Sequence, residues 1–134
     1  MKPRLLMVDD DEAIRTQMKW ALSPDYDMCF AEDRRGIVEA FEANSPAVTL
    51  LDMGLPPCPN ECDEGMAALS DILAIDNMAK VIVVSGQSEK PNAIQAVGAG
   101  AYDFLCKPVD IDELKLLLRR CIHVVDLEKE YRQL

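Results

Sequence analysis

Four short apolar runs, each ending on a charged or hydroxyl residue, constrain the fold of this 134-residue chain more than any other feature. Each run has four or five residues, is rich in leucine or β-branched residues, and is bounded by turn formers. This pattern is typical of a strand that is buried on both faces of a parallel sheet. The runs are residues 5–8 before Asp9, 48–51 before Asp52, 81–84 before Ser85 and 102–106 before Lys107.

Segments with helical periodicity alternate with these strands. A further strand is expected over 26–31, and helices over 11–22, 34–44, 65–76, 91–98 and from residue 110 or 112 onward. Strict alternation of strands and helices predicts a parallel sheet with helices on both faces. We therefore predict a doubly wound (βα)5 α/β fold of the flavodoxin-like type, with strand order 2-1-3-4-5 and an extended C-terminal helix.

Composition and charge exclude several classes of function. Hydrophobic residues make up 49% and charged residues 28% of the chain, as in one ordinary globular domain. No apolar stretch approaches the roughly 20 residues of a membrane span, and no signal-peptide core follows the start. We therefore expect a cytoplasmic protein with no membrane partner. The net charge of −10 argues against direct contact with nucleic acid, so DNA binding would require an output domain outside this sequence.

The five cysteines are an odd number, and we expect reduced thiols rather than a disulfide framework. Cys58 and Cys62 are spaced like half of a zinc site. No second pair of cysteines or histidines completes it, because His123 is the only histidine, and we expect no structural zinc.

Acidic residues follow two of the predicted strands that would be neighbours in the sheet. The carboxyl ends of parallel strands meet at one edge, so Asp9 and Asp10 are expected to face Asp52 there. Carboxylates that lie this close repel each other unless a cation neutralises them. Oxygen ligands beside an open crevice suit Mg²⁺, and the backbone carbonyl of Gly54 is a candidate for a further ligand.

The same edge carries groups suited to a phosphoryl anion. Lys107 offers a positive charge, Ser85 offers a hydroxyl donor, and Asp52 is placed to be the nucleophile that forms an aspartyl phosphate. Taken singly, each residue has an ordinary explanation as a helix cap, an acidic first turn or a turn former. Their joint placement at one edge points to phosphoryl transfer.

These motifs together resemble the receiver domain of two-component response regulators over residues 4–121. They are Val-Asp-Asp-(three residues)-Ile-Arg at 8–15, Leu-Leu-Asp at 50–52, Val-Val-Ser-Gly at 83–86 and Gly-Ala-Tyr-Asp-Phe-Leu-Cys-Lys-Pro at 100–108. The chain is most similar to the N-terminal receiver of NtrC-type sigma-54-dependent regulators. Its loop and tail also resemble the subgroup that is tied to PEP-CTERM systems.

The resemblance implies a role for each residue of the edge. Asp52 would accept a phosphoryl group from a histidine kinase, with Asp10 binding Mg²⁺ directly and Asp9 mostly through water. Ser85 and Lys107 would hold the phosphoryl oxygens. The chain would be a signalling phosphoacceptor rather than an enzyme, with only self-catalysed transfer and slow autodephosphorylation.

The resemblance also implies a switch. Ser85 would move toward the phosphoryl group and Phe104, the aromatic switch position, would turn inward. The face made of the fourth helix, fifth strand and fifth helix would then change its preferred partner and dimerisation, and so control an output, expected to be transcriptional. The Lys107–Pro108 peptide bond would be cis.

One departure from the family pattern lies between Asp52 and Gly65, which are thirteen residues apart. Receivers usually reach the corresponding glycine about five residues sooner, so residues 53–64 contain an insertion. The insertion either alters phosphoryl lifetime or kinase choice, or is a tolerated surface loop.

The predicted last helix continues beyond the receiver pattern, so we divide the chain into a receiver domain (1–121) and a helical linker or coiled-coil extension (122–134) toward an absent output domain. One stripe is expected to pack on the sheet: Ile111, Leu114, Leu118, Cys121 and Val125. A second stripe has heptad-like spacing and is expected to form a homodimer seam: Leu117, Val124, Leu127, Tyr131 and Leu134. The alternative is a frayed, solvated tail, because two heptads alone are marginally stable.

Three other classes of function are compatible with an acidic site on an α/β sheet or with the fold alone. A phosphohydrolase of the haloacid dehalogenase type needs an acid two residues after its nucleophile, where this chain has Gly54. A flavin-binding protein needs a hydroxyl- and glycine-rich loop after the first strand, where this chain has four acidic residues at 9–12. A phosphorylation-independent interaction module stays open.

Overall fold

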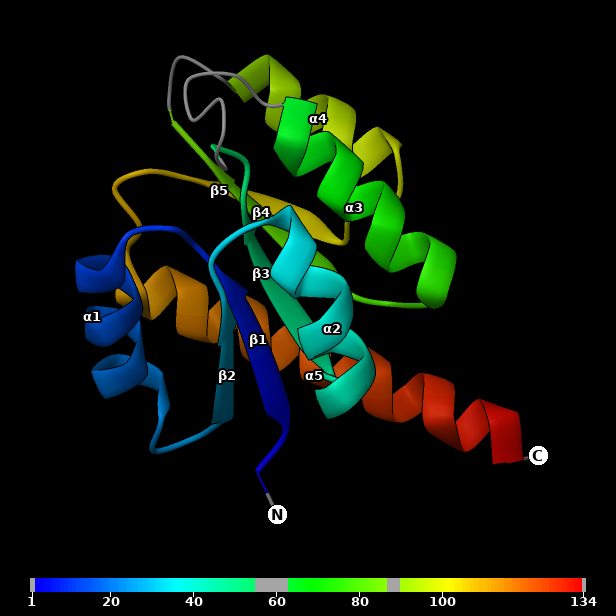
Figure 1. The fold of residues 1–134 in the computed structure, drawn as a ribbon. Helices are drawn as coiled ribbons and strands as arrows, with labels where there is room; N and C mark the ends of the chain where they lie inside the picture. Colours follow the sequence, from blue (N-terminus) through cyan, green and yellow to red (C-terminus); the bar gives the residue numbers. More distant parts are fainter. Residues whose placement is uncertain (1, 55–62, 87–89, 134) are drawn as a thin grey trace.

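The computed structural model describes residues 2–54, 63–86 and 90–133, which form one parallel sheet with order β2-β1-β3-β4-β5 (Figure 1). The strands are β1 (Arg4–Val8), β2 (Asp27–Ala31), β3 (Val48–Asp52), β4 (Val81–Ser85) and β5 (Asp103–Cys106). The helices are α1 (Glu12–Leu22), α2 (Arg34–Asn44), α3 (Asp63–Ile75), α4 (Lys90–Gly98) and α5 (Ile111–Gln133). The predicted fold class and strand order are confirmed.

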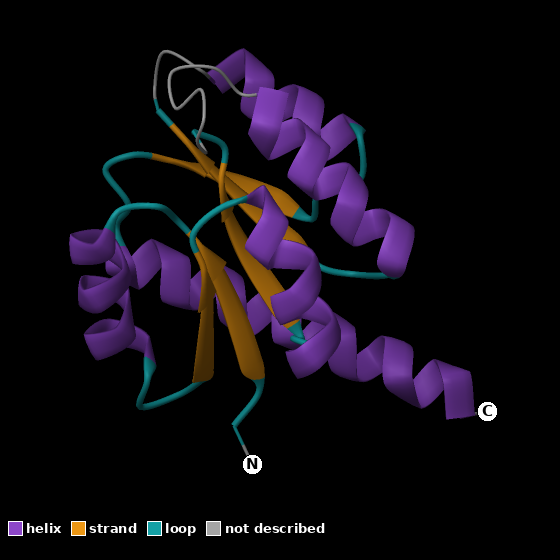
Figure 2. Cartoon of the chain, viewed as in Figure 1, coloured by secondary structure: helices purple, strands orange, loops and turns teal. Residues whose placement is uncertain are grey.

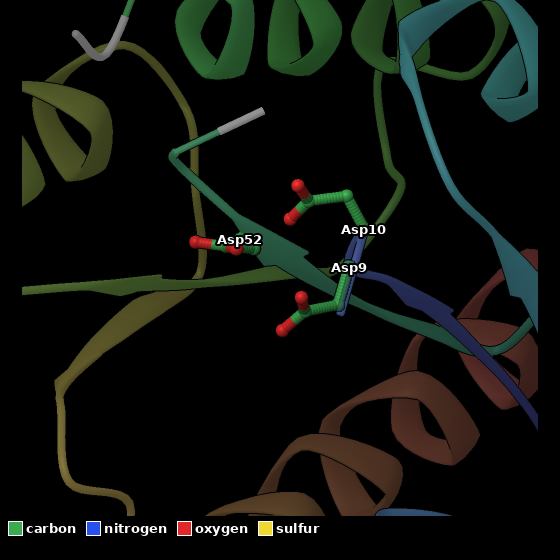
Figure 3. Close-up of side chains that lie close together, drawn as sticks. All are labelled: Asp9, Asp10 and Asp52. Carbon is green, nitrogen blue, oxygen red and sulfur yellow. The ribbon is translucent and has the colours of Figure 1, made fainter. Parts of the chain in front are cut away.

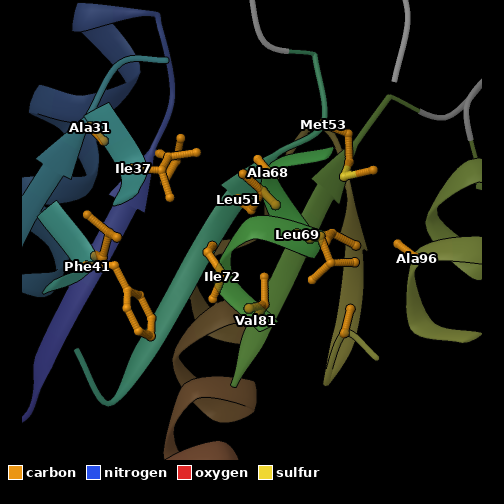
Figure 4. Close-up of a cluster of buried hydrophobic side chains, with 14 of the residues drawn as sticks. Ala31, Ile37, Phe41, Leu51, Met53, Ala68, Leu69, Ile72, Val81 and Ala96 are labelled. Atoms are coloured by element: carbon orange, nitrogen blue, oxygen red, sulfur yellow. The ribbon is translucent and has the colours of Figure 1, made fainter. Parts of the chain in front are cut away.

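Helices cover both faces of the sheet, and Figure 2 shows the three layers. Side chains of successive strand residues point to opposite faces, so each buried strand feeds two cores. In β1, Leu6 and Val8 join the α2–α4 core, whereas Leu5 and Met7 join the α1/α5 core. The α2–α4 core, drawn in Figure 4, includes Ile37, Phe41, Leu51, Leu69, Ile72, Val83 and Ala93. The α1/α5 core includes Met18, Leu22, Leu50, Ile82, Leu105, Leu114 and Leu118.

Aspartate caps set where two helices begin, directly after their strands. The Asp11 side chain accepts hydrogen bonds from the N–H groups of Ala13 and Ile14 at the start of α1. Asp33 accepts one from the N–H of Gly36 at the start of α2. A carboxylate in this position satisfies N–H groups that the helix itself leaves unpaired. The caps therefore fix the loops at the carboxyl edge of the sheet.

Element ends differ from the predictions by one or two residues. Helix α3 begins at Asp63 rather than Gly65, α4 at Lys90 rather than Pro91, and β5 at Asp103 rather than Tyr102. Hydrophobic periodicity gives no signal at such ends, where turn geometry and hydrogen bonding decide. Most of the predicted insertion, together with Cys58 and Cys62, lies outside the described residues.

Helix α5 is a single helix of 23 residues that runs on past the sheet, as Figure 1 shows. Leu114, Leu118 and Cys121 are buried against the sheet, as predicted. Leu117 is buried in the same core, so its assignment to a partner-facing seam is wrong. Positions 114, 117, 118 and 121 follow the i, i+3, i+4, i+7 spacing of one helix face, which explains the burial of Leu117.

The last turns of α5 lie along the amino-terminal edge of the sheet. The Lys80 Nζ, just before β4, donates a hydrogen bond of 2.8 Å to Glu128 Oε1. Ile122 and Val125 line the groove between this part of α5 and the strand starts. On other positions of the helix Leu127 and Tyr131 are exposed, whereas Leu134 lies outside the described residues.

None of the helices in the described ranges combines the length and apolar character that a membrane span requires.

Candidate functional site

Three carboxylates converge at the carboxyl edge of the sheet. Asp9 and Asp10 directly follow β1, and Asp52 is the last residue of β3, its direct neighbour in the sheet. One oxygen from each side chain lies within 4.8 Å of the others. Figure 3 shows the three side chains pointing to the same side of the strand ends.

Asp9 is held in place by its neighbours and is buried, with only 4% of its surface exposed. Its N–H donates to the Ala31 carbonyl at 3.1 Å, and its Oδ1 accepts from the Asp11 N–H at 2.9 Å. Burial raises the pKa of Asp9 to about 6; the Asp11 hydrogen bond lowers it and the charge of Asp52 raises it further. A bound cation would offset the free-energy cost of burying the charged Asp9 carboxylate. Asp10, in contrast to Asp9, is exposed to solvent.

Asp52 is also buried, with 5% of its surface exposed. Its Oδ1 accepts hydrogen bonds from Lys107 Nζ at 3.2 Å and from the Gly54 N–H at 3.1 Å. The Lys107 side chain is 40% exposed, so its ammonium reaches both the carboxylate and the solvent. Asp52 is therefore oriented at the mouth of the site beside a positive charge.

Lys107 and Ser85 are joined through the backbone. The N–H of Lys107 donates to the carbonyl of Ser85 at 2.8 Å, and the Lys107–Pro108 bond is cis, as the resemblance implied. The Ser85 hydroxyl is buried, with 1% of the residue exposed, and it has no hydrogen-bond partner within the described part of the chain. A buried hydroxyl without a partner is costly, so Ser85 holds an unused donor at this edge.

Phe104 lies on the same face of the sheet as Ser85. It is paired in register with Val83, two residues before Ser85, and alternation places residues two apart on one face. Phe104 is half-buried and packs against the α2–α4 core. The structure thus places the serine and the aromatic ring close to each other in the sheet.

The ligand role of the Gly54 carbonyl stays a prediction.

Two residues shape the site without an assigned role in the sequence analysis. Arg15 donates a hydrogen bond of 2.6 Å to the carbonyl of Asp9. Gly65 lies against the backbone of Met53, where an added Cβ would be 2.7 Å from Met53 Cα. Arg15 is the last residue of the motif at 8–15, but the motif alone does not show which atoms its guanidinium contacts.

A mainly apolar cavity of about 250 Å³ opens beside the Asp52 carboxylate. Asp52 and Lys107 lie in its wall with residues of α1 and of the segment after β5. The remaining lining is Met7, Val8, Ile14, Gln17, Met18, Leu50, Val84, Pro108, Val109 and Leu114. The sequence patterns did not reveal this cavity.

The arrangement defines a class of protein: a doubly wound α/β domain with an acidic, cation-compatible crevice, an ammonium group and a buried hydroxyl at one edge of its sheet. A family model described as the response regulator receiver domain matches residues 5–119. The chain therefore belongs to the response regulator receiver domain family, and it is a phosphoacceptor domain of two-component signalling.

Several regulators are similar in sequence. AtoC of Escherichia coli K12 is 29% identical over 132 residues, which cover 98% of this chain and 28% of AtoC. NtrC of the same strain is 34% identical over 117 residues, covering 87% of this chain and 24% of NtrC. The chemotaxis protein CheY of Bacillus subtilis 168 is 32% identical over 116 residues, covering 85% of this chain and 92% of CheY. The chain thus spans about a quarter of the AtoC and NtrC regulators and nearly all of CheY.

Solved structures agree with this assignment. NtrX from Brucella abortus has a TM-score of 0.88 at 28% identity, covering 98% of this chain and 30% of that protein. A response regulator receiver domain protein from Clostridium thermocellum has a TM-score of 0.84 at 28% identity, covering 93% and 98%. The similarity to the PEP-CTERM subgroup stays a prediction.

Proposed function

We propose that Asp52 is the phosphoacceptor of this receiver domain, and that a histidine kinase supplies the phosphoryl group. The observation that carries the proposal is the ion pair of 3.2 Å between Lys107 Nζ and Asp52 Oδ1, with the carboxylates of Asp9 and Asp10 beside it. This combination provides a nucleophile, a counter-charge for phosphoryl oxygens and oxygen ligands for a cation.

In the transfer step, a carboxylate oxygen of Asp52 attacks the phosphorus of a phosphohistidine and a P–O bond forms. The P–N bond breaks, and its electron pair stays on the imidazole nitrogen of the kinase. Negative charge develops on the phosphoryl oxygens, where the Lys107 ammonium attracts it and the Ser85 hydroxyl donates a hydrogen bond. Burial keeps the carboxylate in one orientation for attack.

The residues present fit Mg²⁺. They are three carboxylates with oxygens within 4.8 Å of each other, and two of them are buried. Burial is the main cause that raises the pKa of Asp9 to about 6, and the nearby charge of Asp52 adds to it. Asp10 and Asp52 would ligate the ion directly, Asp9 through water, and the Gly54 carbonyl would add a ligand. When bound, the ion would neutralise the carboxylates and the incoming phosphoryl oxygens.

The partner surface follows from access to Asp52. A donor protein must approach through the residues around the acceptor, which include the wall of the apolar cavity formed by Ile14 and Gln17 of α1 and by Pro108 and Val109 after β5. This part of the surface combines apolar contact area with the reactive carboxylate. We infer that the histidine kinase docks here.

Phosphorylation would act as a switch. The Ser85 hydroxyl, which has no partner in the described residues, would bond the new phosphoryl oxygen, and Phe104 would turn further into the protein. The α4–β5–α5 face would then favour a different partner. We take residues 1–121 as the receiver domain and 122–134 as a helical extension toward an output domain, expected to bind DNA.

We also propose that the exposed side chains of the α5 extension form a homodimer contact. Leu127 and Tyr131 are exposed there, and Val124 is half-buried. The Lys80–Glu128 bond of 2.8 Å supports this, because it keeps the extension helical and turned in one direction. Sedimentation equilibrium with and without beryllofluoride tests the contact: Leu127→Asp should abolish any dimer, and a dimer that persists in this variant would contradict the seam.

Beryllofluoride, which mimics a phosphoryl group, tests the acceptor assignment. With Mg²⁺ present, the wild-type protein should give a bound ¹⁹F NMR signal that Asp52→Asn abolishes. Asp25→Asn, an exposed aspartate away from the site, is the matched control and should bind like the wild type. A bound signal in Asp52→Asn would overturn the assignment. The absence of a signal in the wild type would favour a phosphorylation-independent interaction module.

A further inference from the structure

Arg15 connects three elements at the acidic edge of the sheet. It lies in the second turn of α1, and only 15% of its side chain is exposed. Its Nη1 donates to the backbone carbonyl of Asp9 at 2.6 Å. Its Nη2 donates to Glu32 Oε1 at 3.2 Å, just beyond the end of β2. The guanidinium therefore spans the ends of two neighbouring strands.

The Asp9 carbonyl needs such a donor because it lies beyond the last residue of β1, at the point where the chain turns into α1. The N–H of Asp9 is bonded to Ala31 and its side chain to the N–H of Asp11. The hydrogen bond from Arg15 fixes the peptide that links Asp9 to Asp10. Without it, rotation of this peptide would change the direction in which the Asp10 carboxylate points.

We propose that Arg15 is a positioning residue that holds the Asp9–Asp10 peptide in the orientation required for binding a divalent cation. The inference rests on the proposed function, in which Asp9, Asp10 and Asp52 hold Mg²⁺. Arg15 acts through the backbone of Asp9 and does not contact the ion. Replacement of a residue that orients a metal ligand without touching the metal typically weakens metal binding about 10- to 100-fold.

The charge of Arg15 and its positioning role predict opposite changes in the affinity for a divalent cation when Arg15 is replaced, so an experiment can distinguish them. Removal of a positive charge near three carboxylates, by Coulomb's law alone, strengthens the binding of a divalent cation. Loss of the hydrogen bond to Asp9 weakens it. Arg15→Met keeps the length and apolar packing of the side chain but removes both the charge and the donors, so the direction of the change identifies the dominant effect.

Isothermal titration of the full chain with MgCl₂ tests the inference. Arg15→Met should raise the dissociation constant by about tenfold. Arg15→Lys, which keeps the charge and one cluster of donors but cannot span both partners, should lie between Met and the wild type. Arg35→Met removes the same charge from an exposed position in α2 and is the matched control, expected to bind like the wild type.

The outcomes separate the inference from the function on which it rests. Unchanged or tighter Mg²⁺ binding by Arg15→Met, with normal wild-type binding, would overturn the positioning role alone. A wild type that takes up no Mg²⁺ would contradict the proposed function itself. Thermal unfolding in EDTA verifies that each variant is folded. If Arg15→Met does not fold, Arg15→Lys decides: binding weakened threefold or more supports the role, and unchanged binding overturns it.

Discussion

Lys107 Nζ lies 3.2 Å from Asp52 Oδ1, although 55 residues of chain separate them. The two residues end β3 and follow β5, which are not neighbours, and β4 lies between them. The fold thus brings the ammonium to the buried carboxylate from two strands away. In the absence of a cation, Lys107 is the counter-charge of Asp52.

Replacement of Lys107 should separate phosphoryl binding from cation binding. Lys107→Met removes the charge that we propose holds phosphoryl oxygens, so phosphorylation by a small phosphodonor should slow by about 100-fold or more. Mg²⁺ should bind equally well or somewhat more tightly, because a competing positive charge is lost. Stopped-flow phosphorylation rates and calorimetric titrations measure the two effects. Parallel loss of both would show that Lys107 supports the structure of the site instead.

Stability in EDTA should depend on the ionisation of Asp9. Burial raises its pKa from 3.8 to about 6, so the folded protein disfavours the charged form. The stabilisation from its protonation is complete below about pH 4 and is lost as the pH rises through about 6. Asp9→Asn should therefore increase the free energy of unfolding at pH 8 by up to about 3 kcal/mol.

The advantage of Asp9→Asn over the wild type should shrink between pH 8 and pH 5, as measured by urea unfolding. Equal pH dependence in both proteins would contradict the assigned pKa. The same ionisation predicts that Mg²⁺ binding by the wild type weakens as the pH falls below about 6, because the proton and the cation compete for the carboxylates.

Gly65 should tolerate no side chain. A Cβ there would lie 2.7 Å from both Met53 Cα and Met53 O, next to the backbone that carries the Gly54 N–H to Asp52. Gly65→Ala should lower the free energy of unfolding by about 1–3 kcal/mol and slow phosphorylation by about tenfold. Gly98→Ala is the matched control, because nothing lies within 4 Å of its Cβ position. Equal behaviour of the two variants would contradict this account of the loop.

The Lys80–Glu128 pair should anchor the end of α5. Both side chains are mostly buried, and their bond of 2.8 Å joins residues 48 apart in the chain. A double-mutant cycle with Lys80→Met and Glu128→Gln should give a coupling of about 1 kcal/mol. Amide hydrogen exchange over residues 124–133 should accelerate in either variant. Exchange that is unchanged would show that helix propensity alone holds the extension.

The fold was predictable from the sequence because buried parallel strands and amphipathic helices differ in the periodicity of their hydrophobic residues. The runs at 48–51 and 81–84 are short and mainly apolar without alternation, which is typical of strands in a sheet covered on both sides. The strand order 2-1-3-4-5 was predicted because it is the order of flavodoxin-like folds with this alternation of strands and helices. The convergence of Asp9, Asp10 and Asp52 then followed from topology, without any knowledge of side-chain contacts.

Other features depend on distances that no periodicity encodes. Leu117 fits both a heptad seam and the core face of α5, and only packing against the sheet decided between them. The bond from Arg15 to the Asp9 carbonyl depends on the rotamer of a long side chain. The anchoring of Glu128 by Lys80 joins two elements whose relative position depends on the whole fold.

The site of covalent phosphorylation tests the central claim most directly. The protein is incubated with Mg²⁺ and acetyl phosphate, reduced with borohydride to trap any acyl phosphate, digested, and mapped by mass spectrometry. The account predicts one modified residue, Asp52, and no modification in Asp52→Asn or in EDTA. A modified residue other than Asp52 in the wild type, or trapping at the same level in Asp52→Asn, would contradict it.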